Sequence, residues 1–206
     1  MPGDVLSPEQ KSALDRLIGA GVGSAFYLAG GIGLALHLGH RRSRDFDFFT
    51  SQGSPSIPLR EHLLRIPGLG VSDEREGTLH AVLGGVGVSF LDYPYPLLQP
   101  TTELIPGLPV ASLPDIAAMK VSTIVARGRR RDFVDLHAIC ERLPLSDVLE
   151  AFRRKAGAAY YNPHILAKAL VYFVDAEKDA MPDLLRPVTW ETVRVFFETE
   201  VRRLFG

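Results

Sequence analysis

Two aspartates at alternate positions of a short aromatic segment are the residues of this sequence best suited to chemistry. Asp45 and Asp47 lie two residues apart within the segment Arg44–Thr50, and Phe46 and Phe48 alternate with them. Successive side chains of a β-strand point to opposite faces, so both rings would be buried and both carboxylates would share the other face. Paired carboxylate oxygens suit hard divalent cations, above all Mg²⁺.

A glycine pair, Gly30-Gly31, lies upstream between a predicted buried strand over 25–29 and a predicted helix over 32–38. Glycines let backbone N–H groups approach an anion closely, and the helix dipole favours negative charge there. A phosphate cradle beside two carboxylates is suited to metal-dependent phosphoryl transfer. Each feature alone has an ordinary explanation, because Gly-Gly often precedes a helix and an exposed Asp-x-Asp can simply be solvated. Their adjacency is more specific than either.

The elements around these residues indicate an α+β fold. Ser7-Pro8-Glu9-Gln10 is a capping-box start with proline at the first helical position, which predicts a helix to about Gly19. Gly39 is suited to end the helix that follows the glycine pair. Downstream of the aspartates, the sequence predicts a loop over 51–58 and a short helix over 59–65. A hairpin across Gly84-Gly85 follows over 78–91, and then a surface linker with five prolines over 93–109.

The second half of the chain has the pattern of consecutive helices. They are expected over about 112–128, 130–142 and 146–155, with two more beginning at Asn162-Pro163 and Thr189. We therefore predict a mixed sheet-and-helix core over 1–110 and a helical region over 111–206 packed on it, as two parts or as one continuous domain.

Composition narrows the class of protein. With 206 residues, 46% of them hydrophobic and 23% charged, the chain can bury a sizeable core without disulfides or a structural metal. The single cysteine, Cys140, excludes an internal disulfide and a multi-cysteine zinc site, and its apolar helical surroundings predict an inert thiol. No signal peptide or membrane segment is visible, so we expect a cytoplasmic protein. A net charge of −1 argues against a general nucleic-acid coat but not against a local basic patch.

Two sequence blocks resemble the AbiEii/AbiGii-type nucleotidyltransferase toxins of the DNA-polymerase-β superfamily. Members typically read Leu-x-Gly-Gly-Thr-Ala-Leu-Ala-Leu, then Gly-His-Arg-x-Ser-x-Asp-x-Asp-Phe-Phe. This chain has LAGGIGLAL over 28–36 and GHRRSRDFDFF over 39–49. The segments AAMK over 117–120 and RDFVDL over 131–136 resemble the second family block, and 172–177 with the Trp190 segment resemble its C-terminal part. The resemblance thus covers most of the chain.

The resemblance implies a polymerase-β-like fold and transfer of a nucleotide from an NTP, with Mg²⁺ or alternatively Mn²⁺ as cofactor. It implies an RNA or tRNA end, or a protein hydroxyl, as acceptor, and a cognate antitoxin as partner. The implied roles are metal binding by Asp45 and Asp47, triphosphate contacts from Gly30, Gly31, Ser43, Arg41 and Arg44, and catalytic roles for Lys120 and Asp132. The chain departs from the family at Ile32, where members carry a Thr or Ser hydroxyl that would contact a phosphate.

Three positions compete for the third acid that this superfamily often carries: Asp92, Asp132 and Asp135. Asp92 ends a predicted strand, where a turn-forming aspartate is equally expected. Asp132 and Asp135 lie three apart on a predicted helix and so share a face, and we favour Asp132. Lys120 would neutralise triphosphate charge, although a lysine at the edge of a buried face usually extends to solvent.

Two other functions remain open from the sequence. One is a catalytically lapsed protein of the same fold that binds a nucleotide or a partner, for which Ile32 is the main argument. The other is a small-molecule (antibiotic) nucleotidyltransferase, whose acceptor would call for an acidic pocket. The arginine and lysine clusters over 127–131 and 153–155 are basic instead, and they suit phosphates or simply helix ends.

Overall fold

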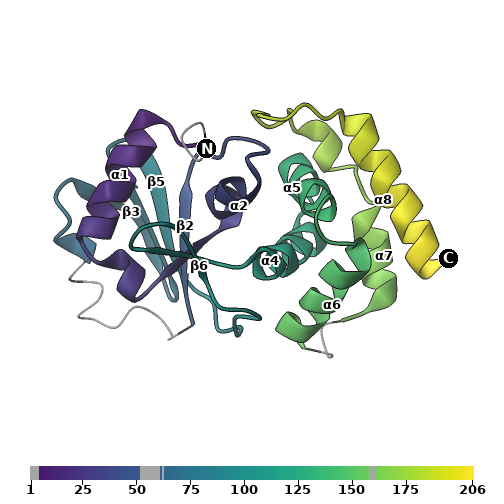
Figure 1. The fold of residues 1–206 in the computed structure, drawn as a ribbon, viewed down its shortest axis with the longest axis horizontal. Coiled ribbons are helices and arrows are strands. Elements are labelled where there is room, and N and C mark those ends of the chain that lie inside the picture. The colour runs from purple at the N-terminus through teal and green to yellow at the C-terminus, as the bar shows by residue number, and fades with distance from the viewer. Residues whose placement is uncertain (1–4, 52–60, 62, 158–160) are drawn as a thin grey trace. The chain divides into compact units, whose positions relative to one another are not determined.

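The computed structural model describes residues 5–51, 61, 63–157 and 161–206. Two compact units make up the chain, Met1–Ser112 and Leu113–Gly206, and each has its own buried core (Figure 1). The predicted loop over 51–58 lies almost wholly outside the described residues. Of the predicted helix over 59–65, the described residues 61, 63 and 64 are helical.

The first unit contains a seven-stranded mixed sheet with the order β3-β4-β5-β2-β1-β7-β6. The β2–β5 and β1–β7 pairs are parallel and the other pairs are antiparallel. The sheet therefore confirms the expected α+β class. The strands are β1 (Tyr27–Ala29), β2 (Phe46–Thr50), β3 (Leu69–Arg75), β4 (Thr78–Leu83), β5 (Val86–Asp92), β6 (Thr102–Ile105) and β7 (Leu108–Val110).

Helices α1 (Pro8–Gly19) and α2 (Gly30–Leu38) agree with the predicted helices, except that α2 begins at Gly30, two residues before the predicted start at Ile32. Helix α1 has Ser7 as N-cap, and the Ser7 and Gln10 side chains form the reciprocal capping box. Helix α2 starts directly after β1 and ends at Gly39, whose φ of 59° is the left-handed conformation that favours glycine. A short 3₁₀ turn, η2 (Val22–Ser24), follows α1. Helix α1 packs against β5, and α2 packs against β1 and β2 (Figure 1).

The proline-rich segment over 93–109 is not a linker, and this prediction was wrong. It contains β6 and most of β7, which extend the sheet beyond β1. The proline within these strands is Pro109 of β7, which is three residues long and pairs with β1 only through Leu28 and Val110, so the ladder loses little by its missing N–H. Strand β3 was also missed, because it is the opposite edge and nearly all of its residues are exposed, so it lacks an apolar alternation.

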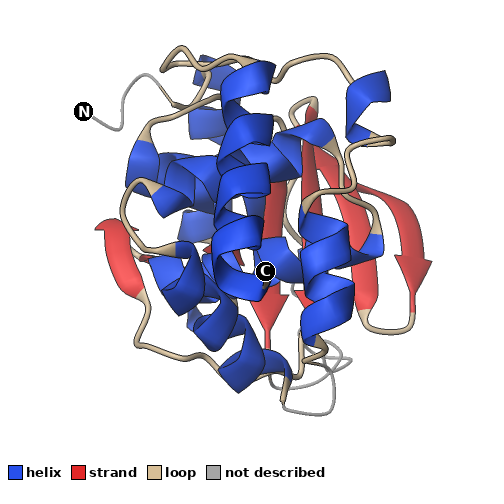
Figure 2. Cartoon of the chain, turned by 90° about the vertical axis from the view of Figure 1, so that its right-hand side faces the viewer, coloured by secondary structure: helices blue, strands red, loops and turns tan. Residues whose placement is uncertain are grey.

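The second unit is helical, as predicted (Figure 2). Phe133 is fully buried at its centre, and its ring centroid lies 5.1 Å from that of Phe173, 6.0 Å from that of Trp190 and 5.5 Å from that of Phe197. These rings join three segments that are far apart in the sequence. The elements are α4 (Leu113–Ala126), α5 (Arg130–Cys140), α6 (Leu145–Ala156), α7 (Pro163–Leu170), the 3₁₀ turn η4 (Ala176–Lys178) and α8 (Trp190–Phe205).

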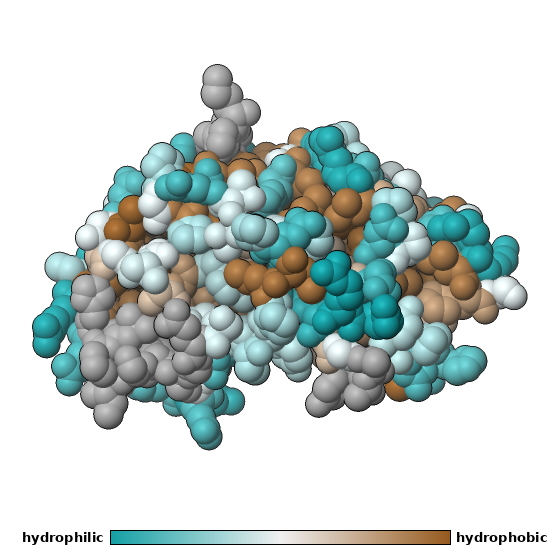
Figure 3. All heavy atoms as spheres, turned by 60° about the horizontal axis from the view of Figure 1, so that its bottom comes forward, coloured by the Kyte–Doolittle hydropathy of each residue, from teal (hydrophilic) through white to brown (hydrophobic). Residues whose placement is uncertain are grey.

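The surface carries polar and apolar residues side by side. On the face seen in Figure 3, hydrophilic residues (teal) alternate with apolar ones (brown), as is usual for a folded domain. A search of the described helices finds none with the length and apolar character that crossing a membrane requires.

Candidate active site

The carboxylate of Asp47 lies against the first residue of α2. Gly30 has a φ of 63°, and a Cβ atom at this position would overlap Asp47 Oδ2. Any larger residue at position 30 would therefore displace the carboxylate, quite apart from its backbone strain. The first N–H groups of a helix have no partners within the helix. A half-buried carboxylate thus borders a helix end that can bind an anion.

Asp45 is held beside a second glycine. It is exposed and lies in the bend just before β2, because the observed strand begins at Phe46 and not at Arg44 as predicted. A Cβ on Gly87 of β5 would approach Asp45 Oδ1 to 2.5 Å. The β2–β5 register pairs Asp47 with Ser89, so Gly87, two residues before Ser89, points to the face of Asp47. Both carboxylates therefore lie on one face of the sheet, as predicted.

Gly31 brings the helix end close to the segment that precedes β2. A Cβ on Gly31 would overlap the Ser43 hydroxyl and would lie 3.0 Å from Arg41 Nη2. Arg41 is buried, and its guanidinium also donates to the carbonyl oxygen of Arg42, 2.8 Å away. Arg44 is exposed. The residues predicted to meet a triphosphate are thus gathered at the N-terminus of α2, except that the side chain of Arg44 extends into solvent. Ile32 is fully buried and belongs to the core.

Gln10 holds this segment from α1, a role that the sequence did not reveal. Its side-chain Nε2 donates to the carbonyl oxygens of Ser43 and Arg44, at 2.8 and 2.9 Å, while its Oε1 accepts from the Ser7 N–H. The capping box predicts the hydrogen bond between Gln10 and Ser7. The two hydrogen bonds to Ser43 and Arg44 fix the backbone immediately before Asp45.

Asp92 cannot share the face of Asp47. The register pairs it with Thr50, three positions beyond the Asp47–Ser89 pair, and an odd offset places a side chain on the other face. Asp92 therefore points to the side of the buried ring of Phe90. Of the three candidates for the third acid, this one is excluded.

Lys120, Asp132 and Asp135 form a buried cluster within the second unit. Lys120 Nζ lies 3.2 Å from Asp132 Oδ1 and 2.6 Å from Asp135 Oδ2. Arg127 Nε lies 3.7 Å from Asp132 Oδ2, and that oxygen has no hydrogen-bond partner among the described residues. Lys120 is only 8% exposed, so the expected alternative of a lysine that extends to solvent is wrong. Two cations thus face two carboxylates.

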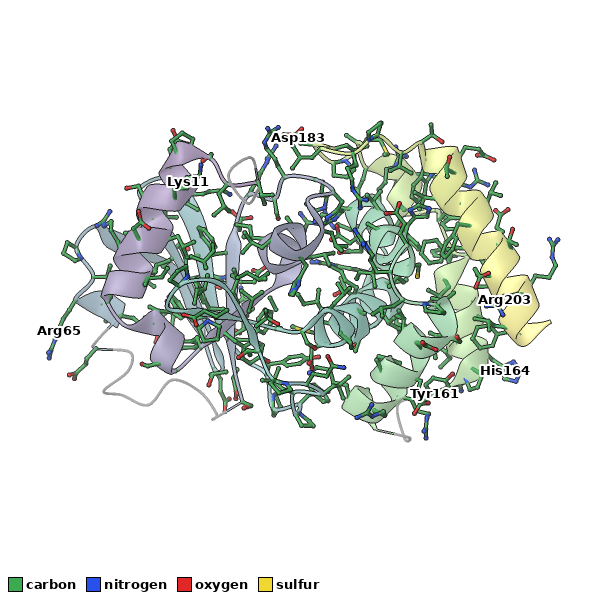
Figure 4. The ribbon with its side chains drawn as sticks, in the orientation of Figure 1. Lys11, Arg65, Tyr161, His164, Asp183 and Arg203 are labelled. Atoms are coloured by element: carbon green, nitrogen blue, oxygen red, sulfur yellow. The ribbon has the colours of Figure 1, made fainter. Side chains whose placement is uncertain are left out.

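Several other basic residues make hydrogen bonds or ion pairs within the fold. Arg130 donates from Nε to the Ala176 carbonyl oxygen at 2.9 Å and lies over the Trp190 ring at 4.9 Å. Lys155 is buried against Asp115, with 2.7 Å between Nζ and Oδ1. Arg203 projects from α8 (Figure 4) and is bonded to Glu200 one turn earlier. For Arg130 and Lys155, these contacts favour a structural role over phosphate binding.

Cys140 is not a candidate nucleophile. Burial raises the pKa of its thiol to about 12, and the negative charge of Glu200 acts in the same direction. The reactive form of a cysteine is the thiolate, so the expected inert thiol agrees with its surroundings.

The two carboxylates fit one mode of magnesium binding. Within the residues that the structure describes, no three acidic, histidine or cysteine side chains converge to hold a metal ion. Mg²⁺ usually keeps several waters and is bound by one or two carboxylates together with substrate phosphates. Asp45 and Asp47, beside a helix N-terminus, supply that donor set.

Comparison with known proteins finds one matching family model. The model described as "Nucleotidyl transferase AbiEii toxin, Type IV TA system" matches residues 12–194. The match covers both units and confirms the resemblance seen in the sequence. The uncharacterized protein aq_aa25 of Aquifex aeolicus (strain VF5) is 34% identical over 202 residues, which are 96% of each chain.

Two solved structures share the fold at low sequence identity. MenT4, a nucleotidyltransferase toxin from Mycobacterium tuberculosis H37Rv, has a TM-score of 0.59 and 19% identity, covering 97% of this chain and 87% of its own. A nucleotidyltransferase from H. pylori, described as putative, has a TM-score of 0.55 and 17% identity, covering 96% and 95%. At these identities the likeness shows a common fold, and it agrees with the predicted polymerase-β-like architecture.

Proposed function

Because the chain belongs to the AbiEii nucleotidyltransferase toxin family of type IV toxin–antitoxin systems, we propose that it transfers a nucleotide from an NTP to an acceptor hydroxyl with the help of Mg²⁺. The observation that carries this proposal is the pair of carboxylates, Asp45 and Asp47, on one sheet face beside the N-terminus of α2. We also propose that residues 1–110 are the catalytic core and 111–206 a helical region, and that Lys120 and Asp132 have catalytic roles.

Each part of the first site has a proposed task. Asp45 and Asp47 hold Mg²⁺, which would neutralise phosphate charge and polarise the reacting phosphoryl group. The backbone of Gly30 and Gly31 binds the triphosphate, because unpaired N–H groups and the helix dipole attract anions. The Ser43 hydroxyl lies beside Gly31, so we propose that it replaces the phosphate contact missing at Ile32. Nucleotide transfer depends mainly on such positioning and electrostatics.

The Lys120 cluster has the properties of a charge-neutralising group. Its lysine is held in one place by two carboxylates, and preorganised cations stabilise the negative charge that develops during phosphoryl transfer. Asp132 is our choice for the distal acid, because its Oδ2 has no hydrogen-bond partner among the described residues while Arg127 stands 3.7 Å away. Asp135 would then fix the lysine.

Membership of the family supports a proposal for the acceptor and one for the partner. We propose an RNA or tRNA end, or a protein hydroxyl, as acceptor, and restraint by a cognate antitoxin. A small-molecule acceptor and a catalytically lapsed binding protein are the competing functions.

A label-transfer assay tests the proposal. The full-length protein would be incubated with Mg²⁺ and each α-³²P-labelled NTP, in separate reactions with total tRNA, with an aminoglycoside and with no added acceptor. We expect label on RNA or on protein, and its loss in Asp47→Asn but not in Asp15→Asn, a variant of an exposed aspartate on α1. Label on the aminoglycoside would identify the small-molecule function. NTP binding without transfer would identify the lapsed protein, and equal transfer by both variants would refute the metal site.

A further inference from the structure

A row of polar side chains extends across the sheet from Asp47. The register pairs Asp47 on β2 with Ser89 on β5, and Ser89 with His80 on β4. Directly paired residues point to the same face, and neighbouring strands lie about 4.8 Å apart. The imidazole of His80 is oriented toward the Asp47 side of the row, since its Nδ1 lies 2.9 Å from Oγ of Ser89, which stands between the two residues. Both His80 and Ser89 are half-buried, so the ring can be reached from solvent.

The proposed reaction needs a general base, and this row of side chains contains a group that can act as one. Attack by a hydroxyl on the α-phosphorus releases a proton, and a positioned base typically contributes about 10²–10⁴-fold in rate. Asp45 and Asp47 are assigned to the metal, and Asp132 is ion-paired with Lys120. Asp92 lies on the opposite face, and the position beside Asp47 on β5 is a serine. Among the described residues of this row, His80 is the titratable group nearest to Asp47.

We propose that His80 accepts the proton of the acceptor hydroxyl, and that Ser89 positions its ring. In the tautomer that donates from Nδ1 to Ser89 Oγ, Nε2 carries the lone pair. The acceptor oxygen forms a bond to the α-phosphorus, the bond to the β-phosphate oxygen breaks, and pyrophosphate leaves with that electron pair. The hydroxyl proton passes to Nε2 and is later released to water. This inference rests on the proposed nucleotide transfer.

Other charged groups border the imidazole. Asp73 on β3 is the register partner of His80 on its other side, and it forms an ion pair with Arg75 at 3.1 Å. Asp47 lies two strands away in the opposite direction.

Rate measurements across pH test the role of His80 in the full-length protein. We expect His80→Gln to lower kcat by about 10²–10⁴-fold. The kcat of the wild type should fall as the pH is lowered, because a protonated imidazole cannot accept the hydroxyl proton, and the variant should lose this acidic limb. Ser89→Ala should lower kcat less and shift the limb, because it frees the ring without removing it. His164→Gln, at an exposed histidine that projects from α7, is the control (Figure 4).

Binding measurements separate this inference from the proposed function. By calorimetry, His80→Gln should bind Mg²⁺ with an α,β-methylene NTP as tightly as the wild type, whereas Asp47→Asn should not. In ¹⁵N spectra of the wild type, the analogue should shift the His80 ring resonance and leave that of His164 unchanged.

The kinetic and binding results distinguish failure of the His80 role from failure of the proposed function. Transfer by His80→Gln at the wild-type rate with an unchanged pH limb would overturn the assignment and leave an ordinary cross-strand hydrogen bond. A bound analogue with an unshifted His80 resonance would also overturn it, while nucleotide transfer could still be demonstrated. If the wild type neither binds nor transfers any NTP, the proposed function fails and the role of His80 fails with it.

Discussion

At the scale of single residues, two glycines make room for two carboxylates. Gly30 and Gly87 have no Cβ, and the space that a Cβ would need is occupied by Asp47 and Asp45 respectively. Turn geometry does not explain Gly87, since this glycine lies within β5. The absence of side chains here therefore shapes the site as much as the carboxylates do.

Gly30→Ala should reduce activity far more than its effect on folding would suggest. An alanine forced to positive φ costs about 1–2 kcal/mol, but here its Cβ would also push the Asp47 carboxylate away. Misplacing a catalytic group by about 1 Å can cost about 10²-fold in rate. Gly39→Ala is a matched control, because Gly39 has a similar φ of 59° and nothing within 4 Å of its Cβ position. Steady-state rates and urea unfolding of both variants give the comparison, and equal loss of rate would contradict this account.

At the scale of elements, α1 supports the site although none of its residues belongs to it. Gln10 closes the capping box of its own helix and also holds the Ser43 and Arg44 carbonyl oxygens. In the second unit, a buried ion pair between Asp115 on α4 and Lys155 on α6 connects two helices in a comparable way. Side chains that the sequence marks only as helix-end or surface residues thus connect separate elements of the fold.

Gln10→Ala should impair catalysis, whereas Ser7→Ala should impair only stability. Losing the serine cap costs about 1 kcal/mol. Losing Gln10 removes the reciprocal bond and two further hydrogen bonds, each contributing about 1 kcal/mol, and it also releases the backbone before Asp45. We expect a lower kcat for Gln10→Ala at temperatures where both variants are folded by circular dichroism. Equal kcat values in the two variants would show that this tie does not influence the site.

Lys155→Met should destabilise the second unit by about 3–5 kcal/mol, because it removes the buried cation that lies 2.7 Å from the fully buried carboxylate of Asp115. The double variant Asp115→Leu/Lys155→Met should recover most of this loss, since it removes both charges. Lys178→Met serves as control, because the Lys178–Asp175 pair is exposed and screened by solvent, so its loss should change stability far less. Urea unfolding measures all three, and a small effect of Lys155→Met alone would contradict the expected desolvation cost.

At the scale of the whole molecule, the chain consists of two units with separate cores, and each carries one cluster of charged residues. The carboxylates and the helix N-terminus belong to Met1–Ser112, and the Lys120 cluster belongs to Leu113–Gly206. Unfolding of such a chain need not be a single two-state transition. Ligands that bind one cluster can therefore be followed through the stability of the unit that contains it.

Mg²⁺ with a non-hydrolysable NTP should raise the unfolding temperature of the first unit. At 100 times its dissociation constant a ligand stabilises by about 2.7 kcal/mol, which corresponds to about 10–20 °C for a unit of about 110 residues that unfolds by itself. Asp47→Asn should lose this shift, while the exposed control Asp15→Asn should keep it. Scanning calorimetry is the measurement. An equal shift in Asp47→Asn would mean that the nucleotide binds elsewhere or without the metal site.

Local patterns in the sequence predicted those features that local physics controls. The capping box of α1, the glycine end of α2, the hairpin at Gly84-Gly85 and the shared face of Asp45 and Asp47 all depend on residues close in the chain. Strands β3, β6 and β7 escaped detection, because exposed edges and prolines remove the apolar alternation by which strands are recognised.

The sequence by itself thus determined the family, the α+β class and the aspartate pair beside a glycine-rich helix start. Only the tertiary structure decided that Gly87 borders Asp45, that Asp92 faces away, that Gln10 holds the segment before β2 and that His80 joins the row of Asp47. The physical reason is strand register. Which residues become neighbours across a sheet depends on pairings between distant segments, and a shift of one residue would move every side chain to the other face.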